Sequence, residues 1–66
     1  DPNLEIRTAQ VALLFLSYPP GRIDGIIGPR TRAAIKNFRI AAGLPAGEEL
    51  DGSAYQAMCK KAGIRP

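Results

Sequence analysis

The chain has 66 residues, with nine lysines and arginines against six aspartates and glutamates, a formal net charge of +3. Its single cysteine and its lack of histidine exclude an internal disulfide, the common structural zinc sites, and the Ser-His-Asp and Cys-His catalytic pairs. The hydrophobic fraction of 45% and the charged fraction of 23% are typical of a globular domain, and the length suits one domain with a small core. The mildly basic balance suits an anionic partner.

The ends of the chain suggest a module of a larger protein. The sequence starts with Asp1-Pro2 and not with Met, which predicts a processed product or an excised module. No signal-peptide pattern is present. The longest apolar run, Val11 to Leu16, is too short to span a membrane, so we expect no membrane insertion.

The first predicted helix runs from about Leu4 to Ser17. Its apolar residues are spaced by three and four positions, as on one face of a helix; they are Ile6, Ala9, Leu13 and Leu16. Asn3, or Asp1 with Pro2 in the first turn, is the predicted N-cap. Pro19-Pro20-Gly21 ends the helix, because neither proline has an N–H to donate.

Two further helices are predicted. Gly28-Pro29 begins the second, which ends at Gly43, and its inward face carries Thr31, Ala34, Ile35, Phe38 and Ala42. Asp51 caps the third and Gly63 closes it, with Ala54, Met58 and Ala62 facing inward. With no strand pattern, the sequence predicts an all-α fold, a compact three-helix bundle with a structured turn before the second helix.

The stretch from Tyr18 to Phe38 contains the pattern Asp-Gly-x-x-Gly-Pro-x-Thr, starting at Asp24 and leading into the second helix. This stretch resembles the core signature of the bacterial peptidoglycan-binding domain, a small three-helix module of cell-wall hydrolases and envelope proteins. The resemblance covers essentially the whole chain and implies one such domain over residues 1–66. Four residues differ from the usual family pattern. The family usually has a larger aliphatic residue in place of Ala9 and a glycine in place of Ser17. It has a glutamine in place of Arg39 and often a threonine in place of Ala54. We expect Ala9 to thin the core locally.

The resemblance implies a non-catalytic domain that binds peptidoglycan in the bacterial cell envelope and targets an attached enzyme or envelope protein to the wall. It implies no cofactor and no metal. The expected groove lies between the Asp24–Gly28 turn and the start of the second helix, and takes the stem peptide and the adjacent sugar. The candidate ligand-binding residues are Tyr18, Asp24, Gly25, Ile27, Gly28, Arg30 and Thr31.

Each candidate also has a structural interpretation. Asp24 suits capping of nearby amides, and Gly25 suits a positive φ. Arg30 either grips a ligand carboxylate through two hydrogen bonds or is merely solvated, and Thr31 either faces the ligand or bonds a local amide. Tyr18 is expected to close one end of the bundle, with its hydroxyl free to reach water or a partner.

A basic stripe is predicted on the second helix, formed by Arg32, Lys36 and Arg39. It is either a solvated face or a contact for an anionic polymer such as wall phosphate. A base-reading helix would carry more Asn, Gln or aromatic residues than the single Asn37, so we expect no nucleic-acid partner.

Val11, Leu14 and Phe15 are apolar in addition to the inward face of the first helix. Either they form a docking face for a neighbouring domain or partner, or the loop from Ile23 to Ile27 covers them. The docking face supports the alternative function of a protein–protein docking domain that keeps the fold but not the wall ligand. The six carboxylates show no convincing acid/base pair, so no enzyme is expected. Cys59 is predicted to be a half-buried small hydrophobe.

Overall fold

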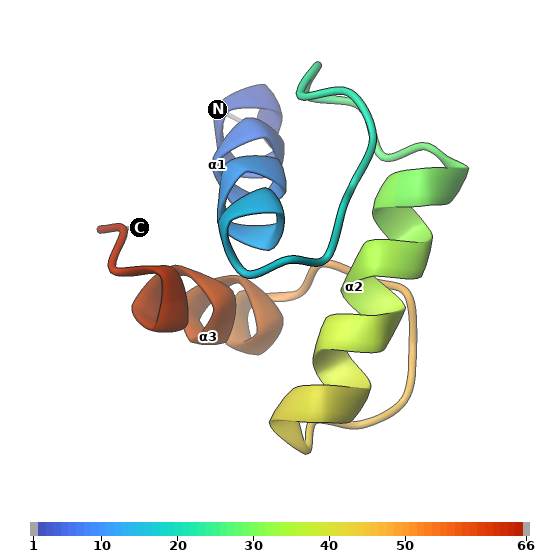
Figure 1. The fold of residues 1–66 in the computed structure, drawn as a ribbon, viewed down its shortest axis with the longest axis vertical. Coiled ribbons are helices and arrows are strands. Elements are labelled where there is room, and N and C mark those ends of the chain that lie inside the picture. The colour runs from blue at the N-terminus through green and yellow to red at the C-terminus, as the bar shows by residue number, and fades with distance from the viewer. Residues whose placement is uncertain (1, 66) are drawn as a thin grey trace.

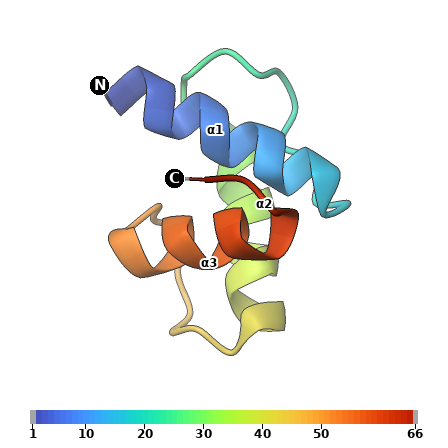
Figure 2. The ribbon, with the colours of Figure 1, turned by 90° about the vertical axis from the view of Figure 1, so that its left-hand side faces the viewer.

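The computed structural model describes residues 2–65, which form three helices and contain no strand. The helices are α1 (Pro2–Phe15), α2 (Pro29–Ala42) and α3 (Gly52–Ala62) (Figure 1). Figure 2 shows α1 and α3 side by side, running in the same direction, with α2 behind them. The predicted all-α three-helix fold is confirmed. Within the described residues, no helix is long and apolar enough to cross a membrane.

The helix boundaries agree closely with the predictions for α2 and α3, but α1 begins at Pro2 and ends at Phe15, each two residues before the predicted position. Asn3 lies inside its first turn, so the prediction of Asn3 as the N-cap is wrong. Pro2 occupies a first-turn position, where its missing N–H is not needed. The alternative cap, Asp1, lies outside the described residues. At α3, the Asp51 carboxylate accepts a hydrogen bond from the amide of Ala54, at 2.8 Å, as a predicted N-cap should.

All three helices end in the same way, with one residue in the left-handed conformation. Gly43 and Gly63 have this role after α2 and α3. After α1 the residue is Ser17, with φ 71°, and it is the non-glycine residue with positive φ among those described. The amide of Ser17 donates to the carbonyl of Leu14 and that of Tyr18 to the carbonyl of Leu13. These two bonds define a Schellman motif, so Ser17 takes on backbone strain that the other two helices avoid.

The core lies where the three helices meet, and the predicted inward faces supply most of it. Its buried residues are Ala9, Ala12, Leu13, Ala34, Ile35, Phe38, Ala54 and Met58. Cys59 is fully buried, so the prediction of a half-buried thiol is wrong. The α3 helix turns this position toward the interior, where burial raises the pKa of the thiol.

Arg39 does not belong to an exposed basic stripe. Its side chain is 6% exposed, and its Nη1 lies 3.4 Å from Oδ2 of Asp51. Its Nε donates to the carbonyl of Pro45 at 2.8 Å and its Nη1 to that of Glu49 at 2.9 Å. The predicted stripe is therefore wrong at this position, because Arg39 turns inward and ties the α2–α3 connection to the bundle. Arg32 and Lys36 are exposed, as predicted.

The outer face of α1 is apolar and uncovered. Val11, Leu14 and Phe15 are 43%, 54% and 71% exposed. The interpretation in which the loop from Ile23 to Ile27 hides them is wrong, because that loop leads from α1 toward the start of α2 (Figure 1).

Candidate functional site

A buried glutamine organises the loop between α1 and α2. Gln10 is fully buried, and its side-chain Oε1 accepts hydrogen bonds from the amides of Asp24 and Gly25 at 3.1 and 3.0 Å. Its Nε2 lies within hydrogen-bond distance of Asp24 Oδ1, the carbonyl of Ile26 and Thr31 Oγ1. One side chain of α1 thus fixes the turn and the first turn of α2.

Asp24 and Gly25 form the predicted turn. Oδ1 of Asp24 accepts from the amide of Ile26 at 3.0 Å. This backbone hydrogen bond, then the one from Gln10, lowers the pKa of Asp24, so its carboxylate is ionised at neutral pH. Gly25 has φ 77° and is buried, which confirms the positive φ and removes Gly25 from the exposed surface.

Thr31 is buried and holds the loop to α2. Its hydroxyl donates to the carbonyl of Pro20 at 2.8 Å and accepts from Gln10 at 3.1 Å. A threonine hydroxyl has one proton to donate, and Thr31 uses it inside the protein. Its side chain therefore has no proton left to donate to a ligand.

The start of α2 leaves two backbone amides without intrahelical acceptors. Gly28 is the N-cap and supplies no side-chain hydrogen bond, and Pro29 follows at the first helical position. The first intrahelical bond runs from the amide of Arg32 to the carbonyl of Gly28, at 2.9 Å. The amides of Arg30 and Thr31 come before it, where helix geometry provides no acceptor and the helix dipole favours negative charge.

A pocket of about 440 Å³ opens at this end of α2. It is lined by Pro20, Gly21, Arg22, Asp24, Ile26, Gly28, Pro29, Arg30 and Thr31. The structure thus brings four predicted site residues together, namely Asp24, Gly28, Arg30 and Thr31. Gly25 and Ile27 do not line this pocket. The carbonyl of Ile27 instead accepts a hydrogen bond from Arg32 Nη1 at 3.1 Å.

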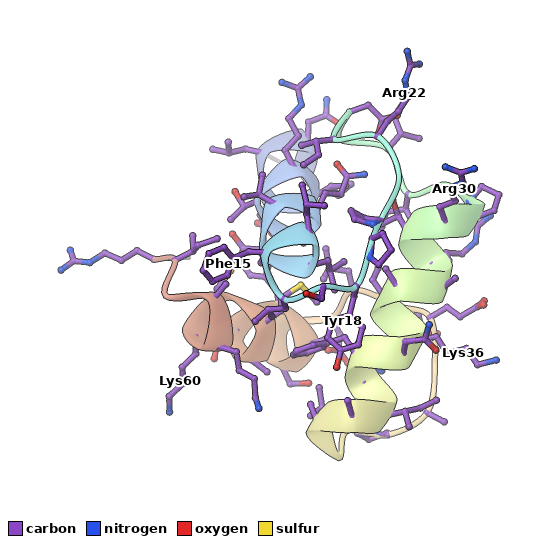
Figure 3. The ribbon with its side chains drawn as sticks, viewed as in Figure 1. Phe15, Tyr18, Arg22, Arg30, Lys36 and Lys60 are labelled. Carbon is purple, nitrogen blue, oxygen red and sulfur yellow. The ribbon has the colours of Figure 1, made fainter. Side chains whose placement is uncertain are left out.

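Arg30 lies along the rim of this pocket. A Cβ added to Gly21 would lie 3.1 Å from Cδ of Arg30, so the aliphatic part of the arginine passes over this glycine. Gly21 also has φ 85°, and a larger residue there would both strain the backbone and push Arg30 away. Figure 3 shows Arg22 and Arg30 at the same end of the molecule.

Tyr18 lies elsewhere. Its ring meets that of Phe38 edge to face, with centroids 5.9 Å apart and an interplanar angle of 88°. It lines a separate pocket of about 200 Å³ with Leu16, Phe38, Ala41, Ala42 and Lys61. The half-buried ring packs against the core and does not share a pocket with Arg30.

Sequence reasoning assigned no role to Gln10, Arg22 or Ile26. Gln10 stands next to the inward-facing Ala9 in a largely apolar stretch, and this position is a signal that could have indicated a buried side-chain amide. Arg22 and Ile26 lie in the loop, where helical periodicity gives no information. Among residues 2–65, no group of three Cys, Asp or Glu side chains could hold a metal ion.

Comparison with known proteins gives one match. A family model with the description "Putative peptidoglycan binding domain" matches residues 2–58. No curated protein and no solved structure matches the chain.

Proposed function

Because the chain belongs to the peptidoglycan-binding domain family, we propose that it is a non-catalytic module that holds an attached enzyme or envelope protein on the bacterial cell wall. One observation carries the proposal: the pocket at the start of α2 is lined by Arg30 and Thr31, and the backbone amides of these two residues lack intrahelical acceptors. A carboxylate of a peptidoglycan stem peptide matches both the arginine side chain and the two amides.

The remaining lining residues suit the rest of such a ligand. Pro20, Ile26 and Pro29 offer apolar contact to a sugar face or an alkyl side chain. The ionised Asp24 keeps one carboxylate oxygen, Oδ2, without a hydrogen bond to residues 2–65, and it can accept from a ligand hydroxyl or amide. The site is open to solvent, so we expect weak binding that becomes useful through tethering, which raises the local concentration of the attached protein.

Catalysis by this pocket has little chemical support. Asp24 is the carboxylate that lines it, and its lowered pKa makes it a poor general acid at neutral pH. The lining includes no second carboxylate that could act as a base. We therefore assign hydrolytic activity, if the full-length protein has any, to another part of that protein.

The test is co-sedimentation of the domain with purified, protein-free wall sacculi at low salt. Arg30→Glu reverses the charge at the pocket, and we expect it to abolish sedimentation. Lys60→Glu makes the same charge change on α3, away from the pocket (Figure 3), and should leave most of the binding intact. Equal loss in the two variants would indicate a general charge effect, and full retention by a folded Arg30→Glu variant would contradict the proposed site.

The exposed outer face of α1 favours a second candidate function, docking onto another protein domain. Leu14 and Phe15 lie on this face and are more than half exposed, and such apolar surface often marks an interaction site. Failure of the wild-type domain to sediment with the protein-free sacculi at low salt would favour docking over direct wall binding.

A further inference from the structure

Four arginines from three parts of the chain gather around the loop that forms the pocket. Arg7 comes from α1, Arg22 from the loop itself, and Arg30 and Arg32 from the first turn of α2. We call these four residues the arginine cluster. All four are exposed.

Each member of the cluster contacts or belongs to the same short loop segment, residues 21–27. A Cβ added to Gly25 would lie 3.2 Å from Nε of Arg7, so this guanidinium rests against the turn. Arg30 passes over Gly21 in the same way, and Arg32 donates to the carbonyl of Ile27. Arg22 lies within the segment and lines the pocket together with Arg30.

The charge of this cluster is largely uncompensated. Asp24 is the one acidic residue between positions 20 and 36. Within residues 2–65 the one ion pair joins Arg39 to Asp51, on the far connection between α2 and α3, where Glu48 and Glu49 also lie. The cluster therefore presents four cations beside one carboxylate, and none of the four forms an ion pair within residues 2–65.

We propose that the arginine cluster binds a phosphodiester-linked wall polymer, a polyol phosphate chain, in addition to the peptidoglycan itself. This inference rests on the proposed wall-binding function. One stem-peptide carboxylate engages Arg30 and leaves three guanidinium groups unmatched, whereas a polyol phosphate chain carries a negative charge at every repeat. Guanidinium groups bind phosphate oxygens through paired hydrogen bonds, and several such contacts along one chain add up.

Single-stranded nucleic acid is a weaker match for this surface. Proteins that bind single strands stack the bases on aromatic side chains, and no aromatic residue lies between positions 19 and 37. In Figure 3, Phe15 and Tyr18 lie away from Arg22 and Arg30. The cluster offers charge without a stacking surface, which suits a polymer that has no bases.

The experiment measures binding of fluorescent poly(glycerol phosphate) by anisotropy over a series of NaCl concentrations. The logarithm of the association constant should fall linearly with the logarithm of salt concentration. Arg7→Gln and Arg22→Gln should each weaken binding and reduce the slope by about one. Lys60→Gln and Lys61→Gln remove the same charge from α3 and should leave the slope unchanged.

Two further arms separate this inference from the proposed function. Wall sacculi stripped of phosphate polymer should still bind the Arg7→Gln variant as well as the wild type, because Arg7 does not line the pocket. Binding to stripped sacculi without binding to poly(glycerol phosphate) would overturn the inference and leave the proposed function intact. Failure to bind stripped sacculi would instead overturn the proposed function. A single-stranded DNA oligonucleotide that bound as tightly, with the same dependence on Arg7 and Arg22, would overturn the choice of polymer.

Discussion

The side-chain amide of Gln10 lies 3.1 Å from the hydroxyl of Thr31, and this buried hydrogen bond joins α1 to the first turn of α2. The Oε1 atom of the same glutamine accepts hydrogen bonds from the backbone amides of Asp24 and Gly25. Asp24 and Thr31 line the pocket and are both held by Gln10, which is far from them in the sequence, so the pocket's shape depends on one side chain of α1.

Replacing Gln10 should destabilise the protein chiefly through the hydrogen bonds that its side chain makes. Gln10→Ala leaves the amides of Asp24 and Gly25 without their acceptor, and unsatisfied buried groups cost about 1–3 kcal/mol each. We expect the free energy of unfolding, measured in urea, to fall by about 2–3 kcal/mol, with faster hydrogen exchange at these two amides. Gln56→Ala, at an exposed position of α3, is the matched control and should change stability by less than about 0.5 kcal/mol. Equal effects of the two substitutions would contradict the structural role of Gln10.

Ser17→Gly should stabilise the protein. Ser17 has φ 71°, a left-handed conformation that costs about 1–2 kcal/mol for a residue with a Cβ. The added freedom of glycine in the unfolded chain offsets part of the gain, so we expect a net increase of about 0.5–1 kcal/mol in the free energy of unfolding. The reciprocal change, Gly43→Ser, should destabilise by a similar amount, because Gly43 has φ 74°. Thermal unfolding of both variants measures the two effects. Shifts of the melting temperature in the same direction would contradict the explanation from the left-handed backbone conformation.

Arg39 should matter for stability and not for wall binding. Arg39→Met keeps the aliphatic part but leaves the carbonyls of Pro45 and Glu49 without the donors at 2.8 and 2.9 Å, and we expect a loss of about 1–3 kcal/mol. Lys36→Met, on the exposed side of the same helix, is the control and should have little effect. Both variants should sediment with wall sacculi under conditions where they are folded. A stable Arg39→Met protein would show that these hydrogen bonds contribute little.

Acid should destabilise the protein through Asp24 and Asp51. Backbone hydrogen bonds, from the amide of Ile26 and the amide of Ala54, respectively, lower the pKa of each carboxyl from its usual 3.8. A lowered folded-state pKa gives stability that is present above pH 3.8 and is lost as the pH falls through the folded-state value. Asp51→Asn should therefore flatten the decline in stability below this pH. Glu48→Gln, an exposed residue without a hydrogen bond or ion pair in residues 2–65, serves as the control and should leave the curve as steep as in the wild type.

Cys59 provides a direct measure of how often the core opens. The thiol is fully buried, and burial raises its pKa, so both access and reactivity are low in the folded state. Iodoacetamide at pH 8 should react at least about 100-fold more slowly with the native protein than with the protein in urea. Gln10→Ala should speed the native reaction in proportion to its loss of stability. Rapid alkylation of the wild type would show that the core opens locally around α3.

The predictions from sequence succeeded where a local signal decides the structure. Pro29, Gly43, Asp51 and Gly63 marked helix ends because their backbone preferences act within a few residues. Apolar spacing located the core face of α2, including Phe38. The family resemblance, carried by a contiguous motif, was confirmed by the family model. Asp24, Gly28, Arg30 and Thr31 line one pocket, and their role in ligand binding stays a prediction.

The sequence by itself determined three helices, the ends of α2 and α3, and the family, because periodicity and capping are properties of neighbouring residues. Only the tertiary structure decided which polar side chains are buried and which groups they contact. Gln10 and Arg39 are buried because distant loops supply their hydrogen-bond partners. Tyr18 is separated from Arg30 because the loop between α1 and α2 runs back beside α1 before it reaches the start of α2 (Figure 1). Burial of a polar group depends on which partners the fold supplies, and that information exists only once the three helices have packed.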